Sequence, residues 1–168
     1  MPQTCAIVGV GGLGAPAAAL LGALGEFDLR LVDDDHVDLS NLPRQPLYGR
    51  EDLGKNKART AARHLQAMRS SGAIEVREER LTAANATTLL EGVAVVIDGT
   101  DSLPAKRFLN QWCCGTRTPL VHAGALGWDG QLMTIVPGQS ACLACLFDDL
   151  GDDREVLNCE QEGILGPV

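Results

Sequence analysis

Short apolar runs alternate with longer amphipathic stretches along most of this chain. Apolar runs bounded by glycine, proline or acidic residues are typical of strands, whereas apolar residues at helical spacing are typical of amphipathic helices. Strands and helices that alternate in this way predict an α/β fold, an open and mostly parallel sheet with helices on both faces. A hairpin and an irregular, cysteine-bearing tail are expected to follow the last helix. The predicted strands are Cys5–Val8, Asp28–Val32, Ile74–Arg80, Val93–Ile97, Leu120–Ala123 and Gln131–Val136, with the hairpin turn around Trp128 to Gly130, and the predicted helices are Ala15–Leu24, Lys55–Leu65, Asn85–Leu90 and Leu103–Cys114.

Length and charge narrow the class of protein. With 168 residues, we expect one domain spanning 1–168 that is able to bury a sizeable core. The formal charge of −8 argues against a general nucleic-acid binder. No apolar run reaches membrane-spanning length, and the first residues lack the charged start of a signal peptide, so a cytoplasmic location is expected. Six cysteines in such a chain indicate metal or redox chemistry more than a disulfide framework.

A glycine-rich turn joins the first predicted strand to the first predicted helix. Gly9, Gly11 and Gly14 form a Gly-x-Gly-x-x-Gly motif, which lets backbone N–H groups and a helix N-terminus approach a phosphate. Asp33 ends the second strand, where a Rossmann-like fold places an acid against ribose hydroxyls. These features predict a nucleotide at the carboxyl ends of the strands, and by themselves they fit NAD as well as ATP.

The residues that follow Asp33 favour a triphosphate over a dinucleotide. A long polar loop, His36 to Gln45, stands where a dinucleotide fold goes quickly into its second helix, and long loops inside compact domains are usually functional. Arg44 and Lys57 supply cations for phosphate oxygens, and Asp101, after the fourth strand, supplies a carboxylate for Mg²⁺. No lysine followed by serine or threonine comes after the last glycine, so the loop is not a Walker A sequence.

The same motifs, in the same order, resemble the adenylation domain of the E1-like superfamily, most closely its ThiF/MoeB-like adenylyltransferases. The resemblance covers nearly the whole chain, which is expected to be short at both ends relative to that family. It implies ATP-dependent adenylation, with Mg²⁺, of the C-terminal glycine of a ubiquitin-like sulfur carrier that ends in Gly-Gly, by a homodimer active in thiamine or molybdopterin synthesis. The residues that carry the resemblance are Gly9 to Gly14, Leu31 to Asp35, Leu39 to Gln45, Gly54 to Lys57, Asp98 to Asp101, Pro119 to His122, Gly130-Gln131, Cys142 to Cys145, Cys159 to Gly163 and Gly166 to Val168.

The resemblance also implies roles for individual residues. Arg44 and Lys57 would contact the phosphates, Asp33 would take the ribose, and Asp101 would ligate Mg²⁺. Cys159 matches a cysteine that carries a thioester, persulfide or acyl-disulfide step in some relatives. The full nucleotide-binding set is Gly9, Gly11, Gly12, Gly14, Asp33, Asp35, Ser40, Asn41, Arg44, Gln45, Lys57, Asp101 and Ser102.

Cys142 and Cys145 form a Cys-x-x-Cys pair that suggests zinc. A structural zinc site needs four ligands, and Cys159 would bring the number only to three, so the expected site is partial. Of the remaining cysteines, Cys5 is expected to lie in the core, and the Cys113-Cys114 pair is expected to serve packing or to lie at the surface.

Three other functions stay open at this point. They are an NAD(P)-dependent oxidoreductase, a dehydratase that cyclises a modified tRNA adenosine (threonylcarbamoyladenosine), and a catalytically weakened scaffold. Single residues also have structural alternatives: Asp101 precedes a helix and is a candidate N-cap, Asp98 is expected to orient its loop, and His122 is expected to be structural.

Overall fold

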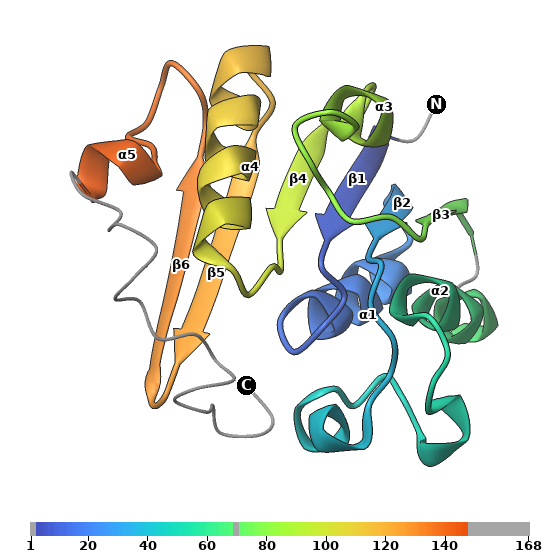
Figure 1. Ribbon diagram of the computed structural model, residues 1–168. Coiled ribbons are helices and arrows are strands. Elements are labelled where there is room, and N and C mark those ends of the chain that lie inside the picture. The colour runs from blue at the N-terminus through green and yellow to red at the C-terminus, as the bar shows by residue number, and fades with distance from the viewer. Residues whose placement is uncertain (1–2, 69–70, 148–168) are drawn as a thin grey trace.

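The computed structural model describes residues 3–68 and 71–147 (Figure 1). The elements alternate along the chain much as the pattern predicts. Two 3₁₀ helices, Leu39–Arg44 and Arg50–Asp52, occupy the long polar segment before the second α-helix. The strands are β1 (Gln3–Val8), β2 (Phe27–Val32), β3 (Ile74–Arg77), β4 (Val95–Asp98), β5 (Leu120–Leu126) and β6 (Asp129–Ile135), and the helices are α1 (Gly14–Leu24), α2 (Lys57–Met68), α3 (Ala86–Leu90), α4 (Leu103–Thr116) and α5 (Leu143–Leu146).

The strands form one sheet in the order β3-β2-β1-β4-β5-β6 (Figure 1). The first five strands in this order are parallel, and β6 pairs antiparallel with β5. The chain leaves β1 toward β2 on one side and returns to pair β4 on the other, so Cys5 lies in register with both Leu29 and Val95. This reversal of strand order next to β1 is where open α/β sheets bind their ligands.

Alternation along β1 divides the core between the two faces of the sheet. Cys5 and Ile7 pack with residues of α1 and α2, whereas Ala6 and Val8 pack with residues of α3, α4 and α5. All four side chains are buried, as a strand covered on both faces requires. The predicted three-layer α/β fold is therefore confirmed.

The ends of several elements differ from the predictions. β3 stops at Arg77 and α2 begins at Lys57, after Asn56 and the preceding residues have formed a turn. The hairpin turn lies at Gly127 and Trp128, since Asp129 already pairs with Leu126. Gly127 has a positive φ of 56°, which explains why the chain reverses there. Within residues 3–68 and 71–147, no helix is long and apolar enough to cross a membrane.

Candidate functional site

The glycine loop after β1 is in backbone contact with the loop after β4. Gly9 has φ +81°, and a Cβ at Gly9 would lie 2.7 Å from the carbonyl oxygen of Gly99. At Gly14 a Cβ would lie 1.8 Å from the carbonyl oxygen of Gly9. The main chains therefore meet where only glycine fits.

Asp33, at the end of β2, holds the glycine loop through its carboxylate. One oxygen accepts from the Val10 N–H at 2.7 Å and the other accepts from the Asp35 N–H at 2.9 Å. Burial raises the pKa of the Asp33 carboxyl, and these two N–H groups only partly oppose the shift. Each oxygen retains a further lone pair, so the predicted contact with ribose hydroxyls is compatible with this geometry.

Tyr48 is a second anchor of the loop, which the sequence reasoning missed. Its hydroxyl donates to the carbonyl oxygen of Val10 at 2.6 Å, and its side chain is buried. The available signal was that Tyr48 is the only tyrosine in the sequence and stands in a polar segment. When a tyrosine ring is buried, its hydroxyl usually finds a hydrogen-bond partner in the fold.

The polar loop after β2 places Arg44 and Gln45 directly against the glycines. A Cβ at Gly12 would lie 3.8 Å from Cδ of Arg44, and one at Gly11 would lie 3.5 Å from Nε2 of Gln45. The Arg44 guanidinium donates to the carbonyl oxygen of Ser40 and to the side chain of Asn41. Six of the predicted residues are thus in one continuous structure.

Asp38 starts this loop by capping its 3₁₀ turn. Its carboxylate accepts from the N–H of Ser40 at 2.8 Å and from the Ser40 hydroxyl. The six-residue turn contains Pro43, which has no backbone N–H to donate within it. The prediction that this stretch forms no regular helix is consistent with that structure.

Lys57 begins α2 with its side chain almost fully buried, and it forms an ion pair with Asp35. The Lys57 N–H also donates to the Asp35 carbonyl oxygen at 2.8 Å, so main chain and side chain hold the two residues together. Burial alone would raise the pKa of Asp35, but the Lys57 ammonium and the His36 N–H lower it below its ordinary value. A buried ammonium with one mostly exposed partner is available to an anion that enters the site.

Asp52 organises the turn before α2, and the sequence reasoning did not single it out. Its fully buried carboxylate accepts from His64 Nε2 at 2.8 Å and from the Gly49 N–H at 3.1 Å, and it pairs with Lys55 and Arg63. Burial opposes ionisation, yet these four groups together lower the pKa of Asp52. The segment between Gln45 and Lys57 is therefore fixed by an interior carboxylate.

Asp101 and Ser102 lie beyond the loop that touches the glycines, and both are exposed. The N-cap of α4 is Ser102, which has extended backbone angles and no side-chain cap bond. The alternative that Asp101 caps the helix is therefore wrong, because the helix starts one residue later. Asp98 orients the loop as expected, since it accepts from the Thr100 N–H at 3.0 Å and from the Thr100 hydroxyl.

The cysteines fall into two groups. Cys142 and Cys145 face each other with their sulfur atoms 3.6 Å apart, whereas Cys159 lies outside the described residues. Across residues 3–68 and 71–147 there is no cluster of three or more metal-ligating side chains. Cys5 and Cys113 are fully buried, and burial raises the pKa of each thiol to about 12, as packing residues require.

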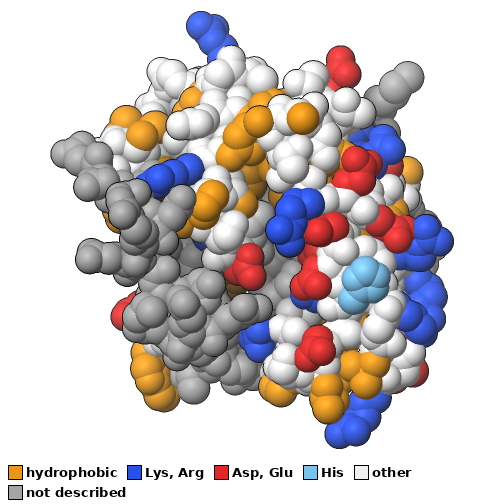
Figure 2. Space-filling model, viewed as in Figure 1, with side chains coloured by type: hydrophobic (Ala, Val, Ile, Leu, Met, Phe, Trp, Pro, Cys, Tyr) orange, Lys and Arg blue, Asp and Glu red, His pale blue; other side chains and the backbone are white. Residues whose placement is uncertain are grey.

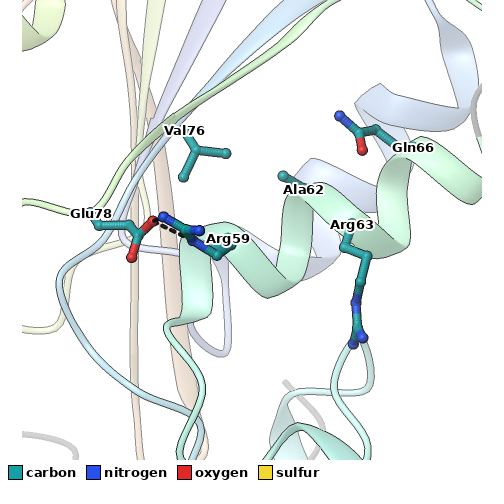
Figure 3. Close-up of a pocket in the computed structure, with 6 residues that line it drawn as sticks. All are labelled: Arg59, Ala62, Arg63, Gln66, Val76 and Glu78. Carbon is teal, nitrogen blue, oxygen red and sulfur yellow. Dashed lines mark hydrogen bonds and ion pairs between the residues drawn. The ribbon is translucent and has the colours of Figure 1, made fainter.

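Charged side chains of both signs gather over β2, β3 and α2, on the right half of the face that Figure 2 shows. A surface cleft of about 370 Å³ lies there between α2 and β3 (Figure 3). Its two cations are already paired, Arg59 with Glu78 and Arg63 with Asp52. None of the predicted nucleotide-binding residues lines it, so it is separate from the glycine loop.

The residues around the glycine loop fit Mg·ATP on their own chemistry. Gln45 is 3% exposed, yet its Oε1 has no hydrogen-bond partner, and such a buried acceptor calls for a donor. Gly9 and Gly14 allow main chain to pack on main chain, and the Arg44 side chain lies against Gly12. The buried Lys57 ammonium pairs with Asp35 and acts electrostatically on Asp33, which holds the loop, so two cations lie near the glycines. Asp101 adds an exposed carboxylate of the kind that Mg²⁺ prefers.

Comparison with known proteins places these features in a wider group. A family model described as "ThiF family" matches residues 2–168. The SAMP-activating enzyme E1 of Haloferax volcanii is 38% identical over 160 residues, which are 95% of this chain and 59% of that protein. The sulfur carrier protein ThiS adenylyltransferase of Escherichia coli K12 is 36% identical over 163 residues, which are 96% of this chain and 64% of that protein. The chain thus spans about 60% of the length of these two curated relatives.

Among solved structures, E. coli MccB with MccA-N7isoASN superposes with a TM-score of 0.80 at 23% identity, over 85% of this chain and 43% of that chain. This likeness establishes the fold alone. The names of the two curated relatives describe activation of SAMP and adenylation of the sulfur carrier protein ThiS, and neither describes an oxidoreductase or a tRNA dehydratase.

Proposed function

The chain belongs to the ThiF family, and from that membership we propose that it adenylates the C-terminal glycine of a ubiquitin-like sulfur carrier protein, using ATP and releasing pyrophosphate. The observation that carries the proposal is the buried Lys57 beside the glycine loop. An ammonium held there by Asp35 is suited to phosphate oxygens. The E. coli relative named above is, by its name, an adenylyltransferase of a sulfur carrier protein, which supports the choice of substrate.

The proposed reaction needs no general base from the protein. The carrier's terminal carboxylate is already ionised, so its oxygen attacks the α-phosphorus without a general base. The bond from the α-phosphorus to the bridging oxygen breaks, and pyrophosphate leaves with that electron pair. Lys57 and Arg44 stabilise the charge that develops on the phosphate oxygens, and the glycine-loop N–H groups orient the chain of phosphates. Mg²⁺, when bound by Asp101, would neutralise part of the triphosphate charge.

Further features of the proposal concern assembly and the cysteines. Residues 1–168 would form one adenylation domain that works as a homodimer in thiamine or molybdopterin sulfur transfer. Cys142 and Cys145 would supply half of a zinc site, and Cys159 would be the candidate for a covalent sulfur or acyl step. Light scattering on the purified chain measures the dimer, and metal analysis measures zinc per protomer.

Carrier-dependent exchange of pyrophosphate into ATP tests the proposed reaction. Lys57→Ala should lower the exchange rate by roughly 100-fold, the usual effect of removing one charge-stabilising group. Arg59→Ala is the matched control, because Arg59 lies on the same helix but pairs with Glu78 at the surface. Its exchange rate should stay within about twofold of wild type.

Three results would contradict the proposal. Exchange in Lys57→Ala at the wild-type rate would remove the role given to Lys57. Nucleotide binding without exchange at any concentration of a Gly-Gly-ending carrier would favour the scaffold function. Tight NADH binding without ATP binding would favour an oxidoreductase.

A further inference from the structure

Three polar side chains from three elements meet in the interior beneath the loop that carries Asp101. Asp98 ends β4, His122 lies opposite it in register on β5, and Lys106 comes from α4. His122 Nδ1 lies 2.7 Å from Asp98 Oδ2, and Lys106 Nζ lies 3.4 Å from the same oxygen. Their exposed fractions are 0% for Asp98, 3% for His122 and 9% for Lys106, so water contributes little to holding these charges.

Lys106 also binds the chain that follows His122. Its Nζ donates to the carbonyl oxygen of Ala123 at 2.7 Å, so a single ammonium joins β4, β5 and α4. The negative charge of Asp98 and the positive charge of Lys106 compensate each other. Because the ionised Asp98 carboxylate only accepts, His122 donates to it through Nδ1, an arrangement in which a buried ion pair is also hydrogen-bonded.

The other oxygen of Asp98 shapes the loop itself. Oδ1 accepts from the N–H of Thr100 at 3.0 Å and from its hydroxyl at 2.6 Å, while the Gly99 N–H donates to the Val8 carbonyl oxygen at 2.8 Å. The direction of the chain as it enters Asp101 is thereby set. Because the side chain of Asp101 is exposed, the location of its carboxylate depends on the backbone of this turn.

We propose that His122 and Lys106 are positioning residues, which act through Asp98 to hold the Asp98–Ser102 turn so that Asp101 meets a nucleotide-bound divalent cation. The inference rests on the proposed function, because the metal role of Asp101 belongs to it. One oxygen of the Asp98 carboxylate contacts His122 and Lys106, and the other accepts hydrogen bonds from Thr100 in the turn. A change at His122 or Lys106 therefore reaches the turn through this carboxylate.

The test compares two amide replacements of His122. Asn places its N–H₂ group near the position of Nδ1 and keeps the bond to Asp98, whereas Gln places its N–H₂ group nearer the position of Nε2. The measured quantity is the dissociation constant of Mn²⁺ in the presence of ATP, followed by the spin-resonance signal of free Mn²⁺, with no carrier present. His122→Gln and Lys106→Met should each raise this constant about tenfold, and His122→Asn should stay within about threefold of wild type.

Cys113→Ala is the control for general destabilisation. Cys113 is fully buried on α4 in the same core but has no part in the network. It should lower the melting temperature without changing the Mn²⁺ constant. If His122→Gln fails to fold, the comparison of Lys106→Met with Cys113→Ala decides the matter in the same way.

The outcomes separate the inference from the proposed function. Wild-type Mn²⁺ affinity in His122→Gln and Lys106→Met overturns the inference even if carrier-dependent exchange is present. Weakened Mn²⁺ affinity in Cys113→Ala to the same extent also overturns it, because the effect would then be one of stability. Weaker Mn²⁺ binding in His122→Gln and Lys106→Met, with unchanged binding in Cys113→Ala, supports the inference even if the wild-type chain shows no pyrophosphate exchange with any carrier.

Discussion

One added methyl group at Gly14 tests how the glycine loop is built. The Cβ of an alanine there would lie 1.8 Å from the carbonyl oxygen of Gly9 and 3.3 Å from Cγ2 of Ile7. Carbon and oxygen need roughly 3 Å or more, so α1 and the loop must separate by more than about 1 Å. The atoms closest to the new methyl group belong to the Gly9 main chain, so this contact cannot be relieved by rotating a side chain.

Gly14→Ala should therefore cost about 3 kcal/mol or more in the free energy of unfolding, at the upper end of what overpacking costs in a closely packed interior. Gly115→Ala is the matched control, because Gly115 also lies in a helix but an added Cβ meets nothing within 4 Å. That variant should gain up to about 1 kcal/mol from the higher helix propensity of alanine.

Urea titration followed by circular dichroism measures both free energies, and a parallel titration with ATP measures nucleotide binding. In Gly14→Ala the N–H groups at the start of α1 shift away from the phosphates, so ATP affinity should fall together with stability. In Gly115→Ala the affinity should be unchanged. If Gly14→Ala unfolds at the wild-type urea midpoint and binds ATP equally well, the close contact between α1 and the loop is refuted.

Three further predictions concern buried groups. Because the pKa of Asp52 is lowered in the folded state, its contribution to stability is present above the ordinary value of 3.8 and is lost as the pH falls through the folded value. Asp52→Asn should thus lower the melting temperature near neutral pH and flatten its decline in acid. Melting curves from about pH 7 down to about pH 2 check this, and a parallel decline in both proteins would contradict it. Tyr48→Phe leaves the Val10 carbonyl without its buried donor and should cost about 1–2 kcal/mol in urea titration, with an unchanged midpoint as the opposing result. In native protein, maleimide should label Cys145 quickly and Cys5 and Cys113 slowly, as mass spectrometry of timed samples would record, since Cys145 is exposed and the other two thiols are buried.

Much of the fold follows from the periodicity of the sequence. The apolar runs Cys5–Val8 and Val93–Ile97 mark β1 and β4, which proved to be central strands, and the alternation of strands with helices predicted their parallel pairing. The errors fall at element ends, where local hydrogen bonds decide the outcome. Asn56, for example, donates to the Asp33 carbonyl oxygen and delays the start of α2 to Lys57.

The predicted site residues were found through their positions at the strand ends and through the resemblance to a family. Their supporting residues were not found, because Asp52, Lys106 and Tyr48 owe their roles to burial and to contacts that form only in the folded chain. Lys106 looks like any surface lysine until α4 packs over β4 and β5 and buries it against Asp98. The side-chain Oε1 of Gln45, which has no hydrogen-bond partner, likewise cannot be recognised from the sequence, because its surroundings form only in the folded chain.

The interlocked glycines have a consequence for the order in which this protein folds. The loop after β1 is made early in synthesis, but it is completed by Gly99, and the neighbouring strand β4 pairs Cys5 with Val95. Closing a segment of such length carries an entropic cost before any contact is gained, and pairings of this kind slow folding. The nucleotide cradle should therefore form late, after the β1–β2–β3 half has associated with the strand on its other side. A nascent chain interrupted before β4 would carry the complete glycine motif and still lack an ATP site.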